Sequence, residues 1–87
     1  MNLKEIKIIG IDGKCQTIKF DYKGLANYIF SKTQDIGELE LARKLYKTGK
    51  VELDKEQAQA LKNYIDQAFG AIVKESLFPK LDKIINQ

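Results

Sequence analysis

Residues 3–20, LKEIKIIGIDGKCQTIKF, decide the first part of the fold. Two runs rich in β-branched residues, 3–9 and 15–20, flank a short connection that contains Asp12 and Gly13. Runs of this kind on either side of an Asp-Gly turn are typical of a β-hairpin. We therefore expect two antiparallel strands joined by a tight turn.

The register of this hairpin follows from the side chains that it brings to each face, because faces alternate with period two. A two-residue turn at Asp12-Gly13 would place Ile6 opposite Lys19 and mix polar with apolar side chains. A type I turn followed by Gly13 in the left-handed conformation pairs Ile6 with Ile18 instead. We expect this second register, which collects the following apolar side chains on one face: Ile6, Ile8, Ile18 and Phe20.

The opposite face of the hairpin is half apolar near the turn. It carries Ile9, Ile11 and Cys15 between the polar side chains of Lys7 and Thr17. Either another element covers this face, or it is open to a partner.

The rest of the chain has the apolar spacing of helices. We predict four of them, over about 22–32, 36–48, 55–69 and 71–86. Because proline lacks a backbone N–H, we expect a break in the last helix near Pro79. The expected fold class is α+β, a single small domain in which the hairpin packs against three or four helices in the order ββααα(α).

An aspartate precedes each of the first three predicted helices. Asp21, Asp35 and Asp54 can accept hydrogen bonds from the N–H groups of the first turn, and Gln57 completes a capping box with Asp54. Residues 51–53 have room only for a short extended connection, with a third strand on the hairpin edge as one option.

Each helix carries an apolar stripe that predicts its core face. The stripes of the first three helices are Tyr22, Leu25, Ala26, Ile29 and Phe30, then Leu39, Leu41, Ala42, Leu45 and Tyr46, then Ala58, Leu61, Ile65, Ala68 and Ile72.

The composition of the 87-residue chain excludes several kinds of chemistry. It has no histidine, the commonest general base, and Cys15 is its single cysteine. One thiol allows neither an intramolecular disulfide nor a zinc site of Cys and His ligands. The apolar residues form neither a signal-peptide stretch nor a membrane span. We therefore expect a cytoplasmic, non-enzymatic protein with no metal, no cofactor and no membrane contact.

A basic cluster in the second helix offers one functional hypothesis. Cations at neighbouring helix positions could face a phosphate backbone. They also fall in the last turns of the helix, where they offset its C-terminal partial charge, so the structural role is the preferred interpretation. A nucleic-acid-associated accessory protein is the alternative function, through these residues: Arg43, Lys44, Lys47 and Lys50.

Surplus apolar surface offers the leading hypothesis. A small domain buries only about 60% of its surface, so apolar residues beyond the needs of one core can serve an interface. We expect a protein-binding or regulatory accessory protein, with a second copy in a homodimer as one candidate partner. The candidate interface residues are Ile9, Ile11, Leu77, Phe78, Leu81, Ile84 and Ile85.

Overall fold

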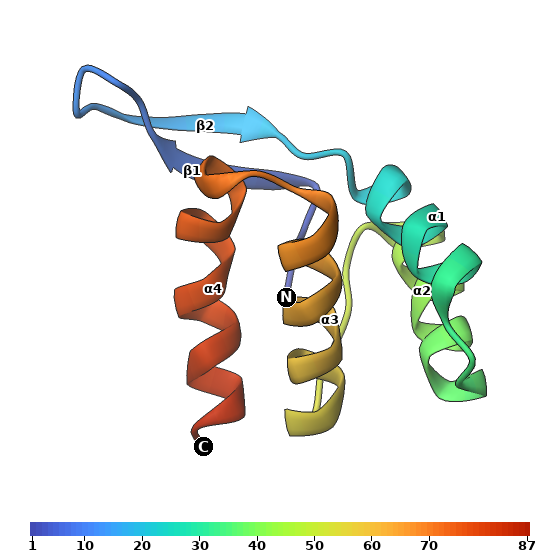
Figure 1. Cartoon of the computed structure of the whole chain (residues 1–87). Helices are drawn as coiled ribbons and strands as arrows, with labels where there is room; N and C mark the ends of the chain where they lie inside the picture. Colours follow the sequence, from blue (N-terminus) through green and yellow to red (C-terminus); the bar gives the residue numbers. More distant parts are fainter.

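The computed structural model describes all residues, 1–87, and contains a two-stranded antiparallel hairpin followed by four helices (Figure 1). The predicted α+β class and element order are therefore confirmed. The elements are β1 (Glu5–Ile9), β2 (Cys15–Lys19), α1 (Tyr22–Lys32), α2 (Ile36–Thr48), α3 (Lys55–Ala68) and α4 (Ala71–Ile85).

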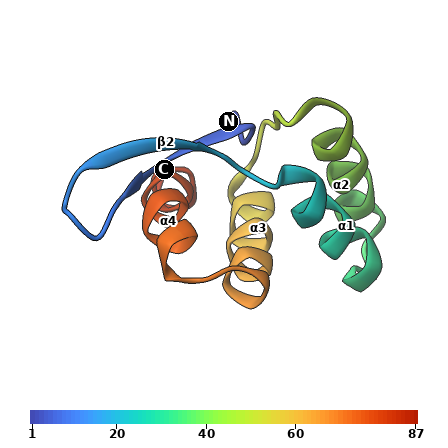
Figure 2. The ribbon, with the colours of Figure 1, turned by 90° about the horizontal axis from the view of Figure 1, so that it is seen from above.

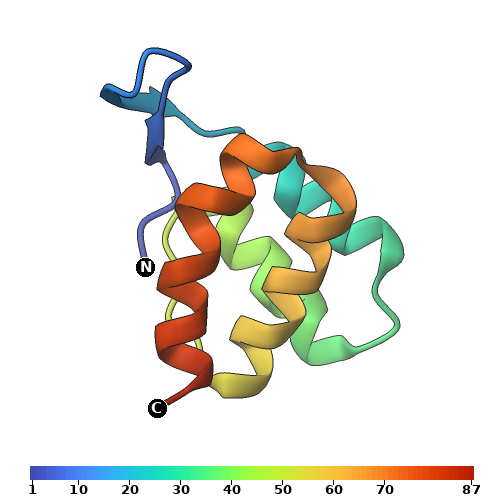
Figure 3. The ribbon, with the colours of Figure 1, turned by 60° about the vertical axis from the view of Figure 1, so that its left-hand side comes forward.

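The helices form two pairs. Seen from above, α4, α3 and the α1–α2 pair follow one another across the molecule (Figure 2). The hairpin lies across one end of α4, which β1 contacts, and its turn projects beyond the helices (Figure 3). The two pairs meet where α1 packs against α3.

The hairpin has the predicted register. Ile6 pairs with Ile18 and Ile8 with Gln16, so one face of the hairpin lies on the helices. Gly13 has a φ of 81°, in the left-handed region that glycine adopts without steric cost. The turn closes with a hydrogen bond from the Gly10 N–H to the Lys14 carbonyl, 2.9 Å.

The segment after α2 pairs with the start of the chain and not with the hairpin edge. The Leu3 N–H donates to the Gly49 carbonyl at 2.7 Å, and the Val51 N–H donates to the Met1 carbonyl at 2.9 Å. Residues 51–53 thus form an extended connection beside an isolated bridge, and the option of a third hairpin strand is not realised.

The caps form as predicted. Asp21, Asp35 and Asp54 each accept a hydrogen bond from the first turn of their helix, and Asp54 with Gln57 makes a complete capping box. Gly49 follows α2 with a φ of 68°, which closes the helix in the left-handed conformation.

The core includes residues from β1, from the segments that connect the elements and from all four helices. It consists of fifteen buried apolar residues: Leu3, Ile6, Phe20, Leu25, Ala26, Ile29, Leu41, Ala42, Leu45, Val51, Ala58, Leu61, Ile65, Leu77 and Leu81. Two of the residues that we assigned to an interface, Leu77 and Leu81, are therefore core residues. They are buried because α4 packs against both α3 and β1.

The predicted break near Pro79 is wrong, since α4 runs without interruption from Ala71 to Ile85. Pro79 leaves the carbonyl of Glu75 without its usual helical partner. Both residues are exposed, so water can hydrogen-bond that carbonyl. The helix therefore tolerates the proline on its solvent side.

The apolar stripes were overestimated at their outer ends. The chain turns at Phe69 and Gly70, so Ala68 and Ile72 no longer lie on one continuous helix and both are exposed. Phe30 of α1 and Tyr46 of α2 are also exposed, because no further element covers the outer side of that pair.

Candidate functional site

The predicted interface residues do not come together in one patch. Ile9 and Ile11 are exposed on the hairpin, whose outer face no other element covers. Phe78, Ile84 and Ile85 are half-buried and pack against the core from α4. In Figure 1 the C-terminal end of α4 lies at the end of the molecule opposite the hairpin.

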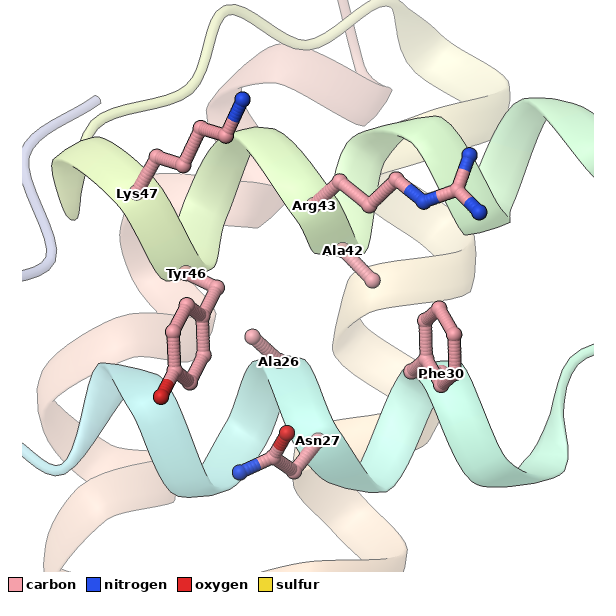
Figure 4. Close-up of a pocket in the computed structure, with 7 residues that line it drawn as sticks. All are labelled: Ala26, Asn27, Phe30, Ala42, Arg43, Tyr46 and Lys47. Atoms are coloured by element: carbon pink, nitrogen blue, oxygen red, sulfur yellow. The ribbon is translucent and has the colours of Figure 1, made fainter.

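A groove between α1 and α2 is a surface hollow lined mainly by apolar residues. Its floor is made by Ala26 of α1 and Ala42 of α2, both buried. Tyr46 and Phe30 stand at its two ends, one from each helix, and their side chains are 45% and 50% exposed (Figure 4). Two small residues facing each other thus leave a space that two large rings enclose.

The sequence did not identify this groove, because it assigned both rings to the core. The signal was present in the spacing. Ala26 lies one turn before Phe30 in α1, and Ala42 lies one turn before Tyr46 in α2, so each helix presents a small and then a large residue on one edge.

Cations border the groove. The Lys23 ammonium lies 5.4 Å from the centre of the Tyr46 ring, and the Arg43 guanidinium lies 5.8 Å from the centre of the Phe30 ring. Lys47 of α2 and Asn27 of α1 also line the groove. No carboxylate is among the lining residues, and Glu40 pairs with Arg43 beside the groove, so apolar walls meet a rim on which cations outnumber carboxylates.

The size of the groove limits what can occupy it. Its volume is about 230 Å³, below the roughly 300 to 1,000 Å³ of typical small-molecule sites. It is also open along one side, so it can receive a side chain presented from another surface. Its polar lining consists of the Asn27 amide, the Tyr46 hydroxyl and the cations Arg43 and Lys47, and includes no carboxylate to act as a general base.

The basic cluster of α2 is exposed, and its members differ in their partners. Arg43 donates from Nη1 to Glu40 Oε1 at 2.6 Å, three residues away. The ion pairs of the structure include none of Lys44, Lys47 and Lys50. Arg43 thus contributes to the groove, whereas Lys44 and Lys50 lie beside a separate polar hollow near the start of the chain.

A hydrogen-bond network holds the α1–α2 pair against α3. The Tyr64 hydroxyl donates to Glu38 Oε1 at 2.6 Å, and the Thr33 hydroxyl donates to the same oxygen at 2.9 Å. Burial, followed by the hydrogen bond to Glu38, raises the pKa of Tyr64 above its usual value. The phenol therefore remains protonated and keeps donating at neutral pH.

Comparison with known proteins identifies no relative: no protein-family model, curated protein or solved structure matches the chain. None of the four helices combines the length and the apolar character that a membrane crossing requires. No group of three or more His, Cys, Asp or Glu side chains is arranged to hold a metal ion.

Proposed function

We propose that this protein is a non-enzymatic binding module whose α1–α2 groove receives an apolar side chain of a protein partner. The observation that carries the proposal is the pair of half-exposed rings, Phe30 and Tyr46, around a floor of two alanines. Aromatic residues beside a small pocket are typical of the few positions that dominate binding energy in protein interfaces.

The two exposed aromatic residues gather at one groove. Phe30 and Tyr46 are 50% and 45% exposed, so about half of each is in water. A partner that covers the rings gains the free energy of that apolar area, about 25 cal/mol per Å². Binding of a partner therefore buries the apolar surface of the two rings that the monomer leaves exposed.

The proposal places the protein in the cytoplasm, where the exposed thiol of Cys15 remains reduced. The partner is a different protein, and self-association is an outcome to be measured. Light scattering over a range of concentrations checks for homodimers before any partner is added.

The groove is tested by selecting displayed random peptides of about 16 residues, a length at which a helix can begin to form. Selected peptides should bind wild type and lose affinity by at least about tenfold for a Phe30→Ala/Tyr46→Ala variant, since hot-spot truncations cost more than about 1.4 kcal/mol. Both rings are half exposed, so this variant should retain the fold, which circular dichroism verifies.

The matched control is Ile72→Ala, which removes an exposed apolar side chain of α4 away from the groove. It should leave peptide affinity unchanged. Peptides that bind the double variant as well as wild type, or a selection that yields no binding peptide, would contradict the proposed function.

Nucleic-acid binding is the second candidate, because Lys44 and Lys50 have no carboxylate partner and border one hollow. It predicts salt-sensitive binding of single-stranded RNA or DNA that a Lys44→Glu/Lys50→Glu variant abolishes. Fluorescence anisotropy with labelled oligonucleotides at low salt measures it. Equal weak binding by wild type and variant would rule it out.

A further inference from the structure

We infer that the partner segment is an acidic amphipathic helix that lies along the groove between α1 and α2. The inference rests on the proposed function and adds the chemistry of the partner. One apolar side chain of this helix sits between Phe30 and Tyr46, and its carboxylates face Lys23, Arg43 and Lys47.

The shape of the groove favours a helix. α1 and α2 are consecutive helices that run in opposite directions side by side, so the hollow between them follows their axes (Figures 1 and 4). An amphipathic helix that lays its apolar side in such a groove is a recurrent mode of peptide recognition. The alanine floor of Ala26 and Ala42 lets an anchoring side chain reach down between the two helices.

The charge of the rim favours carboxylates on the partner. Lys23 and Arg43 already lie over the two rings, and Lys47 lines the groove at the end where Tyr46 lies (Figure 4). α1 contains no acidic residue at all. A neutral partner would leave the cations of the rim without opposite charges, and a basic partner would be repelled by them. An acidic partner would be attracted toward the groove.

Arg43 remains available to a partner although it pairs with Glu40. Both side chains of that pair are more than half exposed, at 53% and 64%, and exposed pairs contribute little stability. A guanidinium also carries five N–H donors, of which Nη1 alone reaches Glu40. A partner carboxylate can therefore bind the remaining donors or compete for all of them.

Helical spacing matches the arrangement of anchor and rim. On a helix, side chains three or four positions apart lie about 5 to 6 Å apart on one face. An apolar anchor flanked at those positions by Asp or Glu places carboxylates on both sides of the anchor. The partner sequence therefore has the pattern of an acid one turn before and one turn after a Leu, Ile, Met or Phe.

The same observations argue against single-stranded nucleic acid at the groove. Base stacking needs an open ring face. A cation lies over the ring of Tyr46 and another over the ring of Phe30. The edges of the rings, and the alanine floor between them, suit an aliphatic or aromatic side chain better than a stacked base.

The random peptides selected on the wild-type protein test this inference. Peptides that depend on Phe30 and Tyr46 should be enriched in Asp and Glu one turn from an apolar residue. Replacing those acids by their amides should weaken binding at least about tenfold. Proline in the middle of the peptide should abolish binding if the bound form is a helix.

Charge reversal of the protein is the complementary experiment. Lys23→Glu/Lys47→Glu should weaken binding at least about tenfold and reduce its salt dependence, because both lysines are exposed at the rim. Lys80→Glu, an exposed lysine of α4, is the matched control and should have no effect.

The outcomes separate this inference from the proposed function. Neutral or basic peptides that need both rings but ignore Lys23 and Lys47 would overturn the acidic helix and leave the protein-binding function intact. Peptides that ignore the rings would overturn both. Binding of labelled oligo(U) RNA that needs these lysines, with no peptide that does, would also overturn the acidic helix.

Discussion

Each of the two helix pairs of this molecule, α1–α2 and α3–α4, consists of consecutive amphipathic helices, but the contacts between the two helices differ. In the α3–α4 pair, two ion pairs join the helices: Lys62 Nζ lies 2.7 Å from Asp82 Oδ1, and Lys74 Nζ lies 2.9 Å from Asp66 Oδ1. The aromatic ring of Phe78 is half-buried under the Lys62 ammonium, at 5.1 Å. The hairpin then covers one end of α4.

No ion pair joins α1 to α2, although a cation of each helix lies over a ring of the other, Lys23 over Tyr46 and Arg43 over Phe30. The ion pair of Arg43 with Glu40 lies within α2 and joins no second element. Both rings remain half exposed. The comparison shows two outcomes for similar amphipathic helices. Where ion pairs bridge the helices, as between α3 and α4, no groove opens, and we call this the sealed pair. Where small residues meet and both rims carry cations, as between α1 and α2, a groove stays open.

The largest expected effect is on the sealed pair. Leu81→Ala removes a completely buried side chain between α4 and its neighbours and should lower the free energy of unfolding by about 2 to 5 kcal/mol. Urea denaturation followed by circular dichroism measures the loss. The control is Ile72→Ala on the exposed side of the same helix, which should cost less than about 1 kcal/mol.

This prediction decides whether Leu81 is core or interface. If Leu81→Ala were as mild as Ile72→Ala, the side chain would have to be free for a partner, and the contrast between the two pairs would fail.

The sequence predicted the elements well because their signals are local. The Ile6–Ile18 register followed from side-chain parity and from the glycine required at position 13. The three aspartate caps marked the helix starts, and the bounds of all four helices agree with the prediction to within about one residue.

The groove could not be predicted because burial at a stripe edge depends on which neighbour covers it. Periodicity treats Phe30, Tyr46 and Leu81 alike, since each belongs to an apolar stripe. Their burial differs because of tertiary packing. Leu81 is buried where α4 packs on α3 and β1, whereas no element covers Phe30 and Tyr46 on α1 and α2. Pro79 was misjudged for the same reason, because its effect depends on whether its side of the helix faces water.

A smaller effect is expected where the two pairs are tied together. Tyr64→Phe removes the hydrogen bond from α3 to Glu38 and should lower the free energy of unfolding by about 1.5 to 3 kcal/mol, the usual contribution of a hydrogen bond to a charged group. Glu38 keeps the Thr33 hydroxyl as a donor, which limits the loss.

The pH dependence of stability identifies this bond. The pKa of Tyr64 is higher in the folded state than in the unfolded state, where it is near 10. The contribution of the protonated phenol to the free energy of unfolding is therefore complete below the unfolded pKa and is lost as the pH rises through the folded pKa. Thermal unfolding between about pH 8 and 11 should therefore show a steeper decline for wild type than for Tyr64→Phe. Parallel profiles for the two proteins would show that the phenol does not link the pairs.

The smallest expected effect concerns the ion pairs that distinguish the sealed pair. Asp66→Asn removes the contact with Lys74, but Asp66 is 62% exposed and its charge is well solvated. An exposed pair contributes about 0 to 1 kcal/mol, so the variant should unfold within that range of wild type. Salt at about 1 M should reduce even this difference, because it shortens the Debye length to about 3 Å. A loss well above 1 kcal/mol that diminishes in salt would mean that the ion pairs hold α3 to α4. Near-equality would mean that the buried leucines hold that pair and that its ion pairs contribute little to its stability. In that case the open α1–α2 groove differs from the sealed pair in what it admits and not in how strongly its helices associate.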